Sequence, residues 1–294
     1  TKIRASYGEI GNQAVGSNMY ISTVSKRTDG NTHWLNGSNK VVAYDLPSLV
    51  SPTLKWERIQ TLDIGGDFGF FNNELNISFD WYQRTTKDML APGQTMPDVL
   101  GAGAPKINAG TLRTRGWELS IDWRHHFNEV NVYANASIGD FKTVITKWDN
   151  DSQLLNENYS GKVYGDIWGF ETDRYFTKDD FNADGSYKEG IASQKKLEQD
   201  GFVYGPGDIK FKDLNNDKEI NGGEGTVKDH GDLKVIGNTT PRYQYGFRLG
   251  GEWKGIDIDM FFQGVGKCDA WTQSAFVMPM MRGADAIYAN QANY

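Results

Sequence analysis

The sequence predicts an all-β fold: a transmembrane, antiparallel, up-and-down β-barrel with long extracellular loops. Three observations predict it. Apolar and polar side chains alternate along several segments, as strands with one apolar face require. These segments come in pairs joined by very short turns. Long connections separate the pairs, so that short turns fall at one end of the sheet and long loops at the other, as in outer-membrane barrels.

The composition is compatible with this fold. Of 294 residues, 38% are hydrophobic and 23% are charged, which excludes a disordered chain and a bundle of membrane helices. No apolar run approaches the ~20 residues that a spanning helix needs. Aromatic residues make up 13% of the chain, and 34 Gly stand against 8 Pro. Strands, interfacial aromatic girdles and tight turns favour such a composition.

Charge and motifs exclude several functions. The net charge is -7 with a pI near 5.2, and no Lys/Arg cluster provides a basic face, so nucleic acid is not an expected partner. The single cysteine, Cys268, excludes an internal disulfide framework. The sequence contains neither a nucleophile elbow nor a phosphate-binding loop. We therefore expect no enzymatic activity and no required cofactor.

Three hairpins carry the alternation. The first covers residues 58–87, the second runs from Trp117 to Ile138 and the third from Tyr243 to Gln263. In the first, one apolar face is expected to contain Leu62, Ile64, Gly66, Phe68, Phe70, Leu75, Ile77, Phe79 and Trp81. Charged residues such as Asp80, Glu118 and Asp122 fall on the opposite face, where they suit a water-filled lumen.

Long connections are expected at about 9–57, 88–107 and 148–240. The chain begins inside a predicted strand, Lys2 to Tyr7, and ends without a closing strand. About seven strands are too few to close a wide barrel. We therefore expect residues 1–294 to be an internal part of one barrel domain, without its final strands.

A soluble β-sandwich is the main alternative. Such a domain, for example a secreted carbohydrate-binding or glycan-degrading module, has shorter strands and short connections at both ends. It predicts apolar packing on both faces of each sheet, whereas the barrel predicts one outer apolar belt with aromatic rims. Trp117, Trp123 and Trp253 are the candidates for those rims.

Several stretches resemble the SusC/RagA family of TonB-linked outer-membrane proteins. They are Arg4-Ala-Ser-Tyr-Gly-Glu-Ile-Gly-Asn-Gln13, Trp56-Glu57 with the hairpin that follows it as far as Leu90, Asn108-Ala-Gly, Arg115-Gly-Trp-Glu118, Trp168-Gly-Phe-Glu-Thr172, and Pro206-Gly-Asp-Ile-Lys-Phe-Lys-Asp-Leu-Asn-Asn-Asp217. They occur in the family order across most of the chain.

The resemblance implies a barrel of roughly 22 strands around a plug domain that lies outside this chain. It implies the outer membrane of a Gram-negative, Bacteroidota-type cell. It further implies active import of oligosaccharides, or of peptides, with a SusD-like surface lipoprotein and with energy supplied through TonB. A family member that acts mainly as a signal-relaying receptor stays a further possibility.

An acidic stretch in the third long loop resembles a calcium-binding loop. Oxygen-bearing side chains occupy its first, third, fifth and twelfth positions, and the seventh would offer a backbone carbonyl. The candidate ligands are Asp213, Asn215, Asp217, Glu219 and Glu224. Lys218 stands where the sharp turn prefers Gly, so a turn rich in Asn and Asp without Ca²⁺ is the alternative. A similar run, 180–186, lacks the last acid and is expected to be a turn before a short helix, 191–199.

Aromatic residues in the long loops are candidates for binding substrate. Loops on a rigid scaffold usually hold binding residues, and an aromatic face can stack on a sugar ring. The candidates are Trp34, Tyr44, Trp148, Tyr164 and Trp168. The alternative is that these side chains pack one loop against another.

Overall fold

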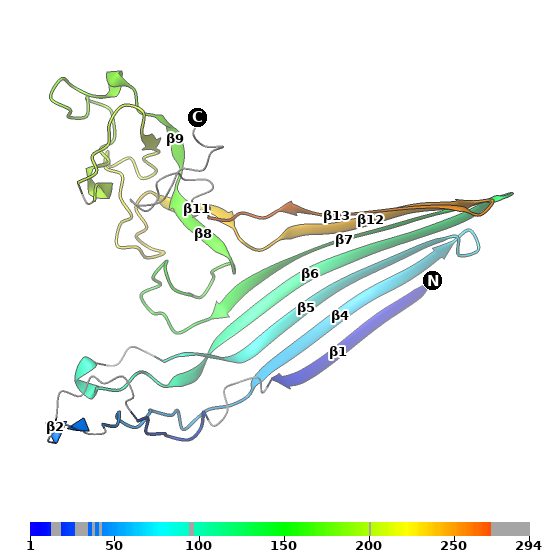
Figure 1. Cartoon of the computed structure of the whole chain (residues 1–294), viewed down its shortest axis with the longest axis horizontal. Helices are drawn as coiled ribbons and strands as arrows, with labels where there is room; N and C mark the ends of the chain where they lie inside the picture. The colour runs from blue at the N-terminus through cyan, green and yellow to red at the C-terminus, as the bar shows by residue number, and fades with distance from the viewer. Residues whose placement is uncertain are drawn as a thin grey trace.

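One antiparallel sheet of seven strands dominates the computed structural model, which describes residues 1–12, 19–26, 35–36, 39–40, 43–93, 97–199 and 201–271. Neighbouring strands follow the order β1-β4-β5-β6-β7-β12-β13 (Figure 1). Their bounds are Lys2–Asn12, Glu57–Phe70, Leu75–Pro92, Lys106–Phe127, Val130–Lys147, Arg242–Trp253 and Ile256–Lys267. The up-and-down order agrees with the predicted fold class. In the part of the chain that is described, no helix is long and apolar enough to cross a membrane.

Short turns join β4 to β5, β6 to β7 and β12 to β13, all at one end of the sheet (Figure 1). Their backbones enter the left-handed region, with φ of 56° at Asn72, 50° at Asn128 and 48° at Lys254. Such turns reverse a strand within a few residues and match its twist. The long connections therefore all leave from the other end of the sheet.

The strand register places the predicted apolar residues on one face, here called the outer face. Phe79, for example, lies beside Gly66 of β4 and Leu119 of β6. The same face continues through Ile121, Ala136, Phe247 and Phe262. Many of its large side chains are exposed, Phe79 by 42%. A continuous apolar face of this size has to be covered by something other than water.

The apolar belt of the outer face has the height of a bilayer core. From Trp117 to Phe127, β6 runs for about 33 Å, which at a strand tilt of about 45° spans about 23 Å along the bilayer normal. Trp253 lies at the short-turn end, level with Phe127, and Trp117 lies at the other limit of this stretch, as two of the predicted rim residues require. Trp123 lies four residues inside the stretch, where its ring stacks on His125.

The opposite face, here called the inner face, is polar. The Nη2 atom of Arg4 lies 2.9 Å from Asp67 Oδ1, 2.9 Å from Asp80 Oδ2 and 3.1 Å from Ser78 Oγ. Asp122 accepts a hydrogen bond from Asn135 on the neighbouring β7. A sandwich core would bury these charges at great cost, so the soluble β-sandwich alternative does not fit this sheet.

Aromatic rings lie directly over glycines on the inner face. A Cβ at Gly116 would come within 2.5 Å of the ring of Tyr82, its cross-strand partner. Only glycine leaves room for that ring. This contact explains the glycine in the Arg115-Gly-Trp-Glu118 motif.

The strands extend further toward the long-loop end than the alternation predicts. β1 continues to Asn12, and β5 and β6 reach into the predicted 88–107 connection, leaving 93–105 between them. Asp88 has a φ of 57°, and the β5–β6 register shifts between Thr86 and Met89. A β-bulge of this kind interrupts the period of two, so the alternation ends before the strand does.

Candidate functional site

The third long connection folds into a lobe, here called the loop lobe, comprising the described residues 148–199 and 201–241. Two small antiparallel sheets organise it. β8 (Asp166–Phe170) pairs with β11 (Leu233–Asn238), and β9 (Thr172–Tyr175) pairs with β10 (Ile209–Phe211) (Figure 1). The predicted helix over 191–199 is wrong, because only the 3-10 turn Lys195–Leu197 forms there.

The loop lobe is joined to the barrel wall by backbone hydrogen bonds. β7 extends beyond the end of β12, and residues 162–164 pair with its free edge. Tyr164 N donates to Thr143 O and Ile145 N donates to Lys162 O, each at 2.9 Å. Asn238 Nδ2 donates to Tyr164 O at 3.0 Å, which holds both ends of the lobe together.

Two fully buried polar side chains, Gln194 and Asp232, form hydrogen bonds with backbone groups of the lobe, as a neighbouring strand would. Gln194 Oε1 accepts from Phe211 N at 2.7 Å, and its Nε2 donates to Ile209 O at 3.1 Å. Asp232 accepts from the backbone N–H groups of Leu214 and Asn221. Each buried side chain is therefore satisfied by two backbone groups, and these hydrogen bonds offset the cost of its burial.

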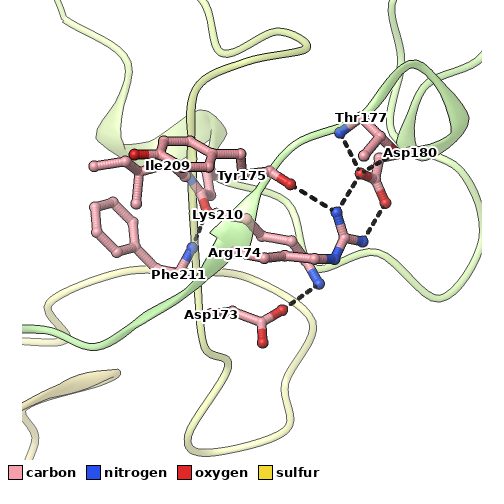
Figure 2. A network of polar contacts seen from close by, with 9 residues as sticks. Asp173, Arg174, Tyr175, Thr177, Asp180, Ile209, Lys210 and Phe211 are labelled. Carbon is pink, nitrogen blue, oxygen red and sulfur yellow. Dashed lines mark hydrogen bonds and ion pairs between the residues drawn. The ribbon is translucent and has the colours of Figure 1, made fainter.

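Arg174 and Asp180 form the principal ion pair of the lobe (Figure 2). The carboxylate of Asp180 is 5% exposed and also accepts from the backbone N–H of Thr177 at 2.7 Å. Its hydrogen bonds from Arg174 hold its pKa well below the ordinary range, although burial acts in the other direction. Asp180 therefore stays ionised and anchors β9 to the turn that follows it.

A polar hollow lies beside Trp148 at the long-loop end. Its volume is about 680 Å³. Its lining residues are Gly93, Trp148, Asp149, Asn150, Asp151, Ser152, Leu154, Asn156, Glu157 and Asn158. The ring of Trp148 also lies over Gly110, where a Cβ would come within 2.8 Å of it. An aromatic face beside acids and amides can stack on a ring and hydrogen-bond to hydroxyl or amide groups.

The other predicted aromatic residues have different surroundings. Trp34 lies outside the described residues. Tyr44 is 65% exposed and pairs through its backbone with Lys26. Tyr164 is 56% exposed at the root of the lobe. Trp168 donates from Nε1 to Tyr159 Oη at 3.2 Å and packs on His230, so it contributes to the interior of the lobe. Of the four candidates that the structure describes, only Trp148 lines the polar hollow.

The predicted calcium loop forms a hydrogen-bonded turn. Asp213 accepts from Asn216 N at 2.6 Å and from Lys218 N at 2.9 Å, and Lys218 has a φ of 66°, the conformation the turn requires. Asp217 accepts from Glu219 N, and this bond, together with the amide of Asn215, lowers the pKa of Asp217.

The remaining candidate ligands of this loop have other surroundings. Glu219 pairs with Lys196, and Glu224 is exposed. Across the described residues, no three His, Cys, Asp or Glu side chains are grouped so as to hold a metal ion. Calcium binding by this loop stays a prediction.

The residues that shape the lobe give little signal in the sequence. Gln194, Asp232 and Arg174 belong to no motif and no periodic segment. Asp180 begins a run that resembles a calcium loop, but its carboxylate turns inward to Arg174. The signal that could have indicated this role is Thr177 three residues earlier, since Thr followed by an acid in that spacing is typical of a capping box.

A sheet with an apolar outer face, a polar inner face and all its long loops at one end is the wall of an outer-membrane β-barrel. The chain belongs to the TonB-dependent receptor-like β-barrel family, which matches residues 1–267. This is a receptor family and not an enzyme family, in agreement with the sequence.

Named relatives support the SusC/RagA resemblance. The chain is similar to TonB-dependent receptor P3 of Formosa agariphila, with 29% identity over 279 residues, covering 89% of this chain and 25% of the relative. It is similar to TonB-dependent receptor SusC of Bacteroides thetaiotaomicron, with 25% identity, covering 83% of this chain and 23% of the relative. The chain thus spans about a quarter of the length of these relatives.

A solved structure shares the fold. The RagAB peptide importer in its open-open state matches with a TM-score of 0.61 and 21% identity, covering 90% of this chain and 26% of that chain. At this identity the likeness concerns the fold alone.

Proposed function

We propose that this chain is part of an outer-membrane importer that takes up oligosaccharides or peptides together with a SusD-like surface lipoprotein and is energised through TonB. The relatives include a receptor named SusC and a structure described as a peptide importer. In this proposal the sheet supplies part of the barrel wall, and the loop lobe supplies part of the mouth that receives substrate.

The hollow beside Trp148 is the observation that carries the substrate proposal. It lies at the long-loop end, which faces outward in barrels of this kind. It combines one aromatic face with several acids and amides. Neutral oligosaccharides and peptides both present the ring, hydroxyl or amide groups that such a surface binds.

Binding by the full-length protein, purified with its lipoprotein, tests this proposal. Panels of neutral oligosaccharides and of short peptides are titrated calorimetrically. Trp148→Ala is expected to weaken binding between about threefold and tenfold, because a stacking contact is lost. Trp253→Ala, at the short-turn rim, is the matched control. Equal affinity of both variants for every ligand that the parent binds would show that the hollow does not bind substrate.

A further inference from the structure

Three cations lie on the outer face directly beyond the apolar belt, toward the long-loop end. Arg115 is two residues from Trp117 and is the cross-strand neighbour of Gln83 and Lys142. Arg113 lies two residues further along β6 and therefore shares the same face. Arg113, Arg115 and Lys142 are here called the basic patch.

The charge of the basic patch is not neutralised within the sheet. Arg115 Nε donates to the neutral Gln83 Oε1 at 2.7 Å. Among the described residues, no carboxylate lies within 4 Å of any of the three cations. Asp140, which lies opposite Trp117 on this face, is bound by Arg242, with Nε 2.5 Å from Oδ1. The patch therefore presents net positive charge to whatever lies beside the barrel at this height.

An apolar hollow lies on the same face, next to the basic patch on the side of the short turns. Its volume is about 190 Å³. Its lining includes Leu119, Ile121, Ala136, Ile138, Tyr245 and Phe247. Ala136 stands between Ile121 and Phe247 in one cross-strand row, and its small side chain leaves the depression between the two larger ones.

The distance between the basic patch and the apolar hollow matches the distance between the phosphate of a lipid and its acyl chains. Lys142 and Ile138 are four residues apart on β7, about 13 Å along the strand and about 9 Å along the bilayer normal. The headgroup layer of a bilayer is about 5–8 Å deep on each side. A phosphate at the patch would therefore place the start of an acyl chain at the hollow.

We propose that this surface binds a phosphate-bearing glycolipid of the outer leaflet, with its phosphate on Arg115 and Lys142 and an acyl chain over Ala136. Three arguments identify this occupant: the long-loop end faces the outer leaflet, the charge of the patch is complementary to a phosphate, and the patch is continuous with the belt that lipid covers. A soluble anion would use the patch but not the hollow.

Lipid binding to the full-length protein in detergent micelles tests the proposal. Diphosphorylated lipid A and dephosphorylated lipid A are titrated, and bound lipid is measured by native mass spectrometry. The double variant Arg115→Gln/Lys142→Gln replaces two exposed side chains and is expected to bind diphosphorylated lipid A about 30-fold more weakly, about fivefold for each cation. Dephosphorylated lipid A is expected to bind the parent and the double variant equally.

Arg84→Gln/Lys254→Gln is the matched control, because it removes the same two residue types from the inner face and from the short-turn end. It is expected to bind lipid A as the parent does. Ala136→Phe, which fills the hollow, is expected to weaken lipid A binding without affecting inorganic phosphate. Equal binding of the two lipids by the parent, equal losses in both double variants, or displacement of lipid A by equimolar inorganic phosphate would each overturn the proposal.

Discussion

Arg174 and Asp180 form a bidentate ion pair, with each terminal guanidinium nitrogen 2.6 Å from a different carboxylate oxygen. Fork-to-fork geometry of this kind is among the stronger pairings available to charged side chains. Because Asp180 is buried, its carboxylate depends on this partner and on Thr177 for the contacts that water would otherwise make.

Asp180→Asn is expected to loosen the loop lobe while the barrel wall stays intact. The amide keeps the shape but loses the charge-assisted bonds, at a cost of about 1.5–3 kcal/mol. Hydrogen–deuterium exchange of the amides around β9 and β10 in the full-length protein measures the change. Asp179→Asn, an exposed neighbour, should leave the exchange unchanged. Equal protection in both variants would mean that the ion pair is not a determinant of the lobe.

Acid is expected to loosen the same lobe. Hydrogen bonds from Lys212 and then Lys234 lower the pKa of Glu171 to about 2, and Arg174 lowers the pKa of Asp180. Carboxyl groups with lowered pKa values stabilise the fold above their unfolded pKa of about 4, and this contribution is lost as the pH falls below that value. Exchange protection in the lobe should stay constant from pH 7 to pH 5 and decline below pH 4. A decline that begins on the alkaline side instead would contradict this assignment.

Gly116→Ala is expected to destabilise the wall. The new methyl group would meet the ring of Tyr82, and overpacking of this kind costs about 1–3 kcal/mol. Urea unfolding in micelles, followed by heat-dependent gel mobility, measures the loss. Gly8→Ala is the matched strand control, since a Cβ there meets nothing within 4 Å. Tyr82→Ala should recover part of the loss in Gly116→Ala, since the Cβ of Phe141, 2.9 Å from the new methyl group, stays in place. Additive effects of the two substitutions would show that the ring and the glycine do not interact.

Neighbouring residues of β6 should report opposite environments. Cys268 is first replaced by Ser, and a spin label is then attached at Leu119→Cys or Ser120→Cys. A lipid-soluble relaxation agent is expected to reach the label at 119 and not at 120, because successive side chains of a strand face opposite sides. The same accessibility at both positions would refute the assignment of outer and inner faces.

The calcium prediction can be tested through Lys218. Lys218→Gly removes a positive charge and suits the observed φ of 66°, so it should raise Ca²⁺ affinity if the loop binds the ion. Calorimetric titration of the chelator-treated full-length protein measures this, with Asp213→Asn as the variant expected to lose binding. No heat of binding in the parent and in Lys218→Gly would leave the loop as a turn only.

Alternation along the strands predicted the faces of the sheet because each face meets one environment over many residues. Phe79 and Asp80 lie on opposite faces for this reason. The alternation could not predict how far β5 extends, since the bulge at Asp88 breaks the period of two. Nor could it indicate Gln194 or Asp232, whose bonds join backbone groups 11–18 residues away without any repeat.

The motif resemblance predicted the family and left the role of each motif residue to the structure. Asn108 accepts from Lys55 N at 2.7 Å and donates to Asp88 O at 2.6 Å, so it ties the first long connection to the bulge. Glu57 accepts from Leu90 N at 3.0 Å. Each is a joint between segments distant in sequence, and such a joint has no local pattern.

The attachment of residues 162–164 to the free edge of β7 has a mechanical consequence. A loop attached only at its two ends can move as a unit, but this one continues the hydrogen-bonded ladder of the strand beneath it. Residues 162–164 are therefore expected to move together with the barrel wall, and a rearrangement of the loop lobe has to begin beyond this anchored segment.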